Sequence, residues 1–451
     1  MKSIDYPTAT AGELARALRK KKISALELAD AAIARIEAQD GPINAVVVRD
    51  FERARAAAKI ADGLLAKGEE APLLGVPMTV KESYDLEGWP TTWGFGRNKD
   101  HRADKDATVV ARLKAAGAII LGKTNVPPSL ADWQSDNEVY GRTNNPHDLN
   151  RSPGGSSGGG AAALAAGFVP LEMGSDIGGS IRIPATFCGV FGHKPSYAIV
   201  PFTGHSLAGA HIAPSELSVP GPMARCADDL ALALDIVAGP DGEAAKGYRL
   251  KLPKPRHKKL ADFNVLVIDS HPRAGTSRDI KAHLGDVAAL LEGAGARVER
   301  ESDLMPDLAN AHGLYLKMLL TIITRRDPNG RAPISAHDWM DLLDAQLRLR
   351  REWAEFFGSF DAVIAPAFGA PAFLHNDRDT AWAERTILID GESTPYGDQL
   401  AWQGIATVAN LPATAMPLGR SSEGLPVGAQ IIGAFLEDHT TIALAGLLRP
   451  R

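Results

Sequence analysis

The sequence is poor in the features that mark secreted, membrane-spanning and nucleic-acid-binding proteins. Its two cysteines, Cys188 and Cys226, are too few for a disulfide framework and fit a reducing compartment. Residues 1–7 lack the apolar run of a secretory signal, and nowhere do roughly 18 apolar residues follow one another, as a membrane-spanning helix requires. The 49 basic and 54 acidic residues are interspersed, so a net charge of −5 gives no general attraction to polyanions. We therefore expect a cytoplasmic protein with neither nucleic acid nor membrane as a partner.

Ordinary globular composition and alternating patterns indicate an α/β fold. Apolar residues make up 45% and charged residues 23% of the 451-residue chain, which excludes disorder as its main state. Two capping boxes, at 10–13 and 24–27, predict helix starts. Strand, helix and strand patterns at 264–269, 278–292 and 297–301 predict a βαβ unit, and hence a parallel or mixed sheet covered by helices. Further helices are predicted at 51–67, 108–116 and 439–448, and further strands at 43–48, 75–80, 118–121, 362–365, 413–417 and 429–432.

Two other stretches have a simple structural interpretation. Residues 239–259 are rich in Gly, Pro and Lys and are the best candidate for a linker. Their basic end has no interleaved aromatic residues, which favours a solvated loop over a polyanion site. Residues 117–124 match the letters of a phosphate-binding loop. The residues between its glycines are Ala-Ile-Ile-Leu, which form a strand rather than a flexible cradle, so we do not expect an ATP site.

The strongest chemical signal is a pair of glycine-rich stretches at 152–160 and 174–184. Glycine at this density costs conformational entropy, so two such stretches around an Ala-rich helical segment are unlike a plain linker. Glycines beside serines allow backbone N–H groups to approach an oxygen that becomes negative when a carbonyl is attacked. The alternative is a pair of tight turns against the sheet. The residues alone do not distinguish which serine would attack.

A serine nucleophile needs a base, and here a lysine fits better than a histidine. None of the twelve histidines has the context of a Ser-His-Asp triad. Residues 154–158 match Gly-x-Ser-x-Gly, but Gly-Gly follows them, which argues against the nucleophile elbow. An ordinary lysine is neutral in about one molecule in two thousand at pH 7, and burial can raise that fraction greatly. Lys81 ends an apolar strand pattern and is the candidate base, with a solvated lysine as the alternative.

Several motifs together resemble the amidase signature family over residues 10–447, almost the whole chain. They are Gly-Val-Pro-Met-Thr-Val-Lys at 75–81, Gly-Gly-Ser-Ser-Gly-Gly at 154–159, Gly-Gly-Ser-Ile-Arg-Ile-Pro-Ala at 178–185, and supporting matches at 121–125, 140–146, 192–195 and 424–430. The resemblance implies an α/β amidase-signature fold, with a large mixed sheet covered on both faces by helices. It also implies one domain over 1–451, with the signature core at about 70–200 and the half at about 260–451 completing the same sheet.

The resemblance also assigns roles to individual residues. It implies a Ser-Ser-Lys triad with Ser180 as nucleophile, Ser156 as bridging serine after a cis peptide bond, and Lys81 as base. The N–H groups of Ile177, Gly178, Gly179 and Ser180 would form the oxyanion hole. An amide would be cleaved through an acyl-enzyme with no metal and no cofactor. We further hypothesise that Asp176 and Arg182 pair to hold the nucleophile loop, the alternative being that both face solvent.

Three functions follow from the resemblance, in order of preference. The first is an amidase that hydrolyses a small or medium carboxylic amide to an acid and ammonia or an amine; a homodimer is compatible with it. The second is the A-type component of a glutamine-dependent aminoacyl-tRNA amidotransferase, although residues 196–205 depart from the usual run of that component. The third is an amide-binding protein without turnover. Two departures from the family pattern, His193 and Pro128, are expected to reshape the pocket. Candidate specificity segments, which could equally be core, are 130–140, 202–217, 314–323 and 396–403.

Overall fold

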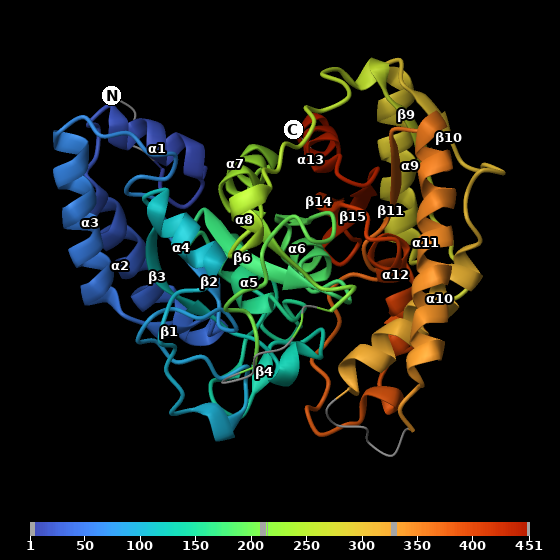
Figure 1. Ribbon diagram of the computed structural model, residues 1–451, viewed down its shortest axis with the longest axis horizontal. Coiled ribbons are helices and arrows are strands. Elements are labelled where there is room, and N and C mark those ends of the chain that lie inside the picture. Colours follow the sequence, from blue (N-terminus) through green and yellow to red (C-terminus); the bar gives the residue numbers. More distant parts are fainter. Residues whose placement is uncertain (1–4, 208–212, 214, 326–331, 449–451) are drawn as a thin grey trace.

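A computed structural model describes residues 5–207, 213, 215–325 and 332–448, and a mixed 11-stranded sheet runs through it (Figure 1). Strands β2, β3 and β6 run parallel, as do β9, β10 and β11, and the remaining neighbours in the sheet are antiparallel. In sheet order the strands are β1 (Val46–Arg49), β3 (Ile119–Thr124), β2 (Pro77–Lys81), β6 (Leu171–Asp176), β8 (Val219–Ala224), β7 (Phe191–Lys194), β14 (Ala413–Arg420), β15 (Pro426–Ile432), β11 (Ala362–Pro366), β9 (Asn264–Val267) and β10 (Arg297–Glu299).

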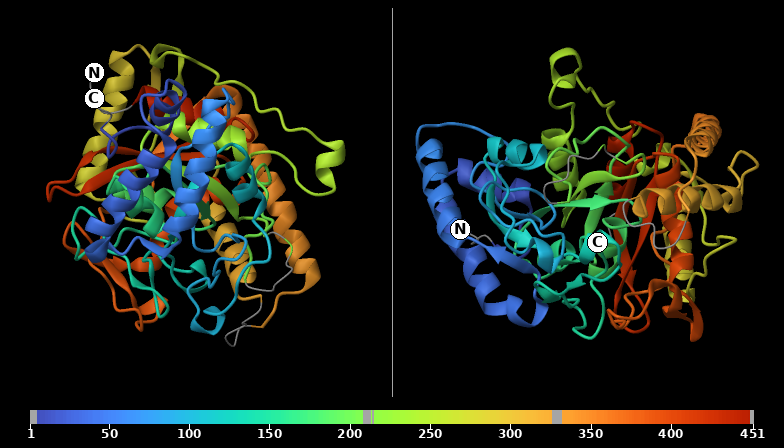
Figure 2. Two further views of the ribbon diagram at one scale, coloured as in Figure 1. Left: turned by 90° about the vertical axis from the view of Figure 1, so that its left-hand side faces the viewer. Right: turned by 60° about the horizontal axis from the view of Figure 1, so that its bottom comes forward.

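Helices cover this sheet, which confirms the expected α/β class. The views in Figures 1 and 2 place α1–α3 beside the β1 end and α9–α11 beside the β10 end. Two small hairpins, β4 (Asp136–Asn137) with β5 (Gly141–Arg142) and β12 (Thr386–Ile389) with β13 (Glu392–Pro395), lie outside the sheet. The helices are α1 (Ala11–Arg19), α2 (Ala25–Ile43), α3 (Phe51–Ala66), α4 (Thr108–Ala115), α5 (Gly158–Ala165), α6 (Arg182–Cys188), α7 (Ala227–Val237), α8 (Ala244–Gly247), α9 (Arg278–Gly293), α10 (Leu308–Ile323), α11 (Ala336–Ser359), α12 (Leu400–Val408) and α13 (Asp438–Leu447).

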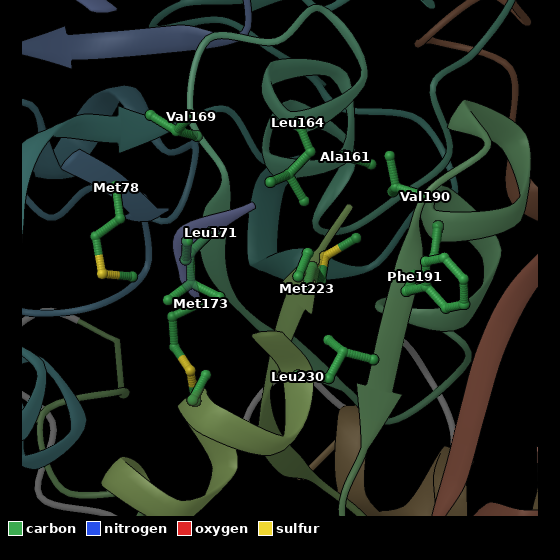
Figure 3. Close-up of a cluster of buried hydrophobic side chains, with 14 of the residues drawn as sticks. Met78, Ala161, Leu164, Val169, Leu171, Met173, Val190, Phe191, Met223 and Leu230 are labelled. Carbon is green, nitrogen blue, oxygen red and sulfur yellow. The ribbon is translucent and has the colours of Figure 1, made fainter. Parts of the chain in front are cut away.

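The central strands are buried on both faces, and strand alternation separates an apolar face from the face that carries the chemistry. On β6, Glu172 points toward α5, where an added Cβ on Gly160 would lie 2.5 Å from the glutamate Cγ. Leu171 and Met173 alternate with it and so belong to the opposite face. Figure 3 shows both in one cluster with Met78 of β2. This packing fixes the strands that end at the site.

Most predicted elements are confirmed, although several predicted boundaries differ from the observed ones by about three residues. The predicted helices at 51–67, 108–116 and 278–292 correspond to α3, α4 and α9. The predicted strand at 43–48 instead begins at Val46, because α2 continues to Ile43. The Asp40 carboxylate accepts hydrogen bonds from the N–H groups of Ala45 (2.7 Å) and Val46 (3.0 Å), and Asn44 caps the helix with φ 57°. These bonds extend the helix over residues whose apolar pattern looked like a strand.

The phosphate-loop pattern forms a strand, as expected, whereas the predicted linker is only partly a solvated loop. Residues 119–124 of the phosphate-loop pattern form strand β3. In the predicted linker, however, Arg256 is not part of a solvated loop, because its guanidinium binds Glu437 and also lies 3.1 Å from Asp361. Arg256 therefore anchors the segment to the body of the molecule, whereas the lysines of the basic end are exposed, as a solvated loop predicts: Lys251, Lys254, Lys258 and Lys259. Every helix in the described part of the chain is too short or too polar to cross a bilayer.

Candidate active site

Lys81 ends strand β2 in the interior of the molecule, and its ammonium group faces two serines. Its Nζ lies 2.7 Å from Ser156 Oγ and 3.0 Å from Ser175 Oγ, and none of the side chain is exposed. Burial lowers the pKa of Lys81 to about 7, against the opposing influence of Asp176 and Glu172. The apolar strand that delivers Lys81 is thus also the reason why its amine can be neutral near pH 7.

Glu172 lies on the neighbouring strand β6 and adds to this environment. Its carboxyl accepts hydrogen bonds from the hydroxyls of Thr79 and Thr124. Burial raises the pKa of Glu172 to about 8, so the protonated, neutral form predominates at pH 7. When Glu172 is protonated, its negative charge no longer raises the pKa of Lys81, which favours the free base. In the sequence, Glu172 is a single glutamate inside an otherwise buried strand, and no motif pointed to it.

Ser156 follows the cis peptide bond Gly155–Ser156 and precedes helix α5. The expected Ala-rich helical segment is helix α5, and it begins within the glycine run, at Gly158. The glycines permit close packing: an added Cβ on Gly159 would lie 2.3 Å from the backbone nitrogen of Asn125. Ser156 is nevertheless bonded to a lysine, so the geometry at this serine is not that of a Ser-His pair.

Residues 177–180 form a turn in which all four carbonyls have fixed partners. The Ile177 carbonyl accepts from the hydroxyl of Tyr315 (2.9 Å), and the Gly178 carbonyl accepts from the indole N–H of Trp133 (2.8 Å). The other two accept from backbone N–H groups, Gly179 from that of residue 183 (2.8 Å) and Ser180 from that of residue 157 (3.1 Å). Fixing each carbonyl also fixes the direction of the adjoining peptide N–H groups.

The N–H groups of this turn are not all equally available. Those of Ile177, Gly178 and Ser180 have no acceptor within the described residues. The N–H of Gly179 donates to Asp176 Oδ1 at 3.0 Å, and this corrects the expectation that all four groups are open to a substrate oxygen. The reason is the position of Asp176 at the end of β6, where its carboxylate caps the turn.

Asp176 and Arg182 form a buried ion pair, as hypothesised from the sequence. Arg182 Nη2 lies 2.9 Å from Asp176 Oδ1, and both side chains are fully buried, so the solvent-facing alternative was wrong. Burial alone would raise the pKa of Asp176, but the charge and hydrogen bonds of Arg182 outweigh it and lower that pKa to about 2. Arg182 also donates to the side chains of Gln430 (2.8 Å) and Thr407 (2.9 Å), which joins the 177–180 turn, through Asp176 and Arg182, to β15 and α12.

Ser180 lies at the end of this turn, immediately before α6. Its backbone carbonyl is bonded to the N–H of Ser157, the residue after Ser156, so the two glycine-rich stretches meet here. The hydroxyl of Ser180 forms no hydrogen bond with any described residue. The structure therefore joins Lys81 to Ser156 directly, whereas Ser180 is linked to this stretch through the backbone bond to Ser157.

The structure adds residues that sequence analysis did not single out. Ser175, Trp133 and Tyr315 contact the lysine or the 177–180 turn, and Trp133 and Tyr315 fall within the candidate segments 130–140 and 314–323. Part of the segment 202–217, namely 208–212 and 214, lies outside the described residues. Sequence patterns offered no means of choosing single residues in these segments, because buried aromatic residues serve the core equally well.

His193, one of the two departures from the family pattern, lies on β7 and is bonded through both ring nitrogens. Its Nε2 is 3.0 Å from Asp438 Oδ1, and its Nδ1 is 2.9 Å from Thr414 Oγ1. These bonds join β7 to α13 and β14, so His193 contacts neighbouring secondary structure and none of the three candidate catalytic side chains.

Within the described residues, no three His, Cys, Asp or Glu side chains converge as metal ligands do.

Comparison with known proteins decides the family. The family model described as Amidase matches residues 27–341 and 317–442. The chain belongs to the amidase signature family. This membership confirms the expected amidase-signature fold and places the protein among enzymes that cleave amides. The chain is 32% identical to human fatty-acid amide hydrolase 2, over 97% of this chain and 87% of the relative.

Other relatives within the amidase signature family differ in what their names state. The chain is 31% identical to the A-type component of the glutamyl-tRNA(Gln) amidotransferase of Psychrobacter cryohalolentis, over 97% of this chain and 95% of that protein. It is similar to the crystal structure of a bacterial aryl acylamidase, with a TM-score of 0.82, 26% identity, and coverage of 98% of this chain and 96% of the other. Hydrolases and amidotransferase components are thus both similar to this chain.

Proposed function

We propose that the protein is an amidase that hydrolyses a carboxylic amide to an acid and ammonia or an amine through a Ser-Ser-Lys triad. The observation that carries the proposal is the buried Lys81 amine, 2.7 Å from Ser156 Oγ and with a pKa lowered to about 7. A lysine in this state can accept a proton, which an exposed lysine rarely does at neutral pH. The likeness to amide hydrolases over nearly the full chain supports the same reaction.

In the proposed mechanism, neutral Lys81 takes a proton from Ser156, which in turn takes one from Ser180. The Ser180 oxygen attacks the amide carbonyl and forms a tetrahedral intermediate. The N–H groups of Ile177, Gly178 and Ser180 stabilise its negative oxygen. The same proton relay, run in reverse, protonates the departing amine, and water then hydrolyses the acyl-enzyme. Because the Ser180 hydroxyl has no partner among the described residues, it is free to rotate toward Ser156.

The A-type component of an amidotransferase is the second candidate, favoured by the 31% identity to such a protein. It differs from the first in needing a partner chain and in using glutamine as the amide donor. The run at 196–205 departs from the usual sequence of that component, which favours the independent amidase. Ammonia release from glutamine, measured with and without a partner chain, separates the two candidates. Release that occurs only when a partner chain is present would indicate the amidotransferase.

A fluorophosphonate probe tests the triad without knowledge of the substrate. This reagent forms a covalent adduct with an activated serine, which intact-mass measurement and peptide mapping detect. We expect one adduct, on Ser180, and its suppression in Lys81→Ala. An adduct on Ser156 alone would reverse the roles of the two serines. No adduct on the wild type, together with no release of ammonia or amine from a panel of amides, would refute the amidase proposal.

A further inference from the structure

A second pocket lies away from the three proposed catalytic side chains, in the C-terminal half of the sheet. It has a volume of about 530 Å³ and is bounded by the loop 271–275 after β9, by His312 on α10 and by Asp398 before α12. His271 is 9% exposed and Arg273 is exposed. Polar groups therefore meet in this pocket, and the question is which ligand would satisfy them.

The hydrogen bonding of His271 determines which of its ring nitrogens carries the proton. The backbone N–H of Arg273 donates to His271 Nδ1 at 3.0 Å, so Nδ1 is the acceptor of the ring. Burial, together with the positive charges of His312 and Arg273, lowers the pKa of His271 to about 4, and the ring is neutral at pH 7. The proton of the neutral ring is then on Nε2. This N–H is buried and has no acceptor among the described residues.

Two neighbouring groups share this condition. The ring of Trp402 packs edge-on against His271, with a centroid distance of 5.3 Å, and its fully buried indole N–H also has no acceptor within the described part of the chain. His312 Nδ1 is likewise buried and unpaired there. The guanidinium of Arg273 lowers the pKa of both imidazoles but forms no ion pair with any described residue. Buried donors are normally paired in native proteins, so the N–H groups of His271 and Trp402 lack an acceptor.

We propose that this pocket binds a carboxylate group. A carboxylate offers two acceptor oxygens, and two residues that line the pocket have donors to offer, the Arg273 guanidinium and the unpaired Nε2–H of His271. Asp398 also lines the pocket; burial raises the pKa of its carboxyl, and its negative charge would oppose the bound anion. Removing the charge of Asp398 is therefore expected to strengthen carboxylate binding, whereas removing the charge of Arg273 is expected to weaken it.

The pocket and the proposed oxyanion turn are carried by the same helices. His312 lies one turn before Tyr315 on α10, and the hydroxyl of Tyr315 holds the Ile177 carbonyl. Trp402 precedes Gln403 on α12, and the carbonyl of Gln403 accepts from Arg182 Nη1 at 3.2 Å. The carboxylate can be the far end of an amide substrate or a free acid such as the product. The assignment of the carboxylate to a substrate or a product rests on the proposed function. The proposal that the pocket binds a carboxylate does not depend on that function.

Calorimetric titration with sodium glutarate tests the proposal, with neutral 1,5-pentanediol, which has the same chain length and no amide group, as the control ligand. We expect glutarate to bind the wild type and pentanediol not to bind. Arg273→Gln should weaken glutarate binding by about tenfold or more, because a charge-assisted hydrogen bond is lost. Asp398→Asn should strengthen binding, and Arg300→Gln, at an exposed arginine outside the pocket, should leave it unchanged. No binding to the wild type, or equal binding to Arg273→Gln, would overturn the proposal.

The two sources of the carboxylate are distinguished with a matched pair of amides, glutaramic acid and valeramide. If the carboxylate belongs to the substrate, Arg273→Gln raises the KM for glutaramic acid and leaves that for valeramide unchanged. If a free acid occupies the pocket, glutarate still binds and neither KM changes. Failure of the proposed function is a separate result, because an enzyme that turns over no amide and forms no fluorophosphonate adduct can still bind glutarate in the calorimeter.

Discussion

The state of Lys81 makes a quantitative prediction about how reactivity depends on pH. With a pKa of about 7, about half of the enzyme has a neutral lysine at pH 7, about one molecule in eleven at pH 6 and about one in a hundred at pH 5. A lysine of ordinary pKa would be neutral in about one molecule in two thousand at pH 7. Burial therefore increases the free base by about 1,000-fold. We expect the rate of Ser180 labelling by a fluorophosphonate to fall on the acid side with a midpoint near pH 7.

Lys81→Met removes the amine while keeping an apolar chain of similar length. We expect this variant to be labelled roughly a hundred to ten thousand times more slowly, and to lose the midpoint near pH 7. Lys194 provides a matched control, because burial also lowers its pKa to about 7 and its Nζ donates only to the carbonyls of Pro195 (3.0 Å) and Leu411 (2.7 Å). Lys194→Met should retain the pH dependence.

The assay is the pseudo-first-order rate of adduct formation between about pH 5 and 9, read by intact mass, with circular dichroism at each pH to confirm folding. The reasoning would be refuted by a flat profile in the wild type. It would equally be refuted if Lys81→Met kept the same midpoint while Lys194→Met lost it, because the titrating group would then be the wrong lysine.

Three other substitutions test how the site is held. Asp176→Asn should cost about 3–5 kcal/mol of unfolding free energy in urea titrations, because Arg182 is left buried without its partner; unaltered stability and labelling would reject a structural role for the pair. Tyr315→Phe should slow labelling by about tenfold with little change in the urea midpoint, because the Ile177 carbonyl loses its donor and the turn its fixed direction; an unchanged rate would contradict this. Gly159→Ala should lower the free energy of unfolding by roughly 1–3 kcal/mol or more, because its Cβ would meet the backbone of residue 125. As a control, Gly313→Ala should be neutral or stabilising by about 0.5–1 kcal/mol, because an added Cβ there has nothing within 4 Å. Equal effects of the two substitutions would show that the close approach at Gly159 does not limit stability.

Local patterns predicted elements well where each segment was governed by its own periodicity and caps. The capping boxes at Thr10 and Ser24 are formed, and the helix behind Ser24 carries the expected apolar face. The same reasoning failed at residue 43, where the Asp40 side chain prolongs a helix through bonds that no short-range pattern shows. In the glycine-rich region the expected Ala-rich helical segment is present, but it begins earlier than intrinsic propensity favours, at the three glycines 158–160, because tertiary packing requires small residues there.

The sequence by itself determined the α/β class and, through its motifs, the resemblance to amidase signature enzymes and the choice of Lys81 and two serines as candidates. These features are encoded in residue type and spacing along the chain. Only the tertiary structure decided that Lys81 is fully buried against Ser156 and Ser175, that the N–H of Gly179 is already bonded to Asp176, and that the other half of the chain holds the 177–180 turn through Arg182. Burial and hydrogen-bond direction depend on residues far apart in sequence, and the pKa values that govern the proposed chemistry depend on burial.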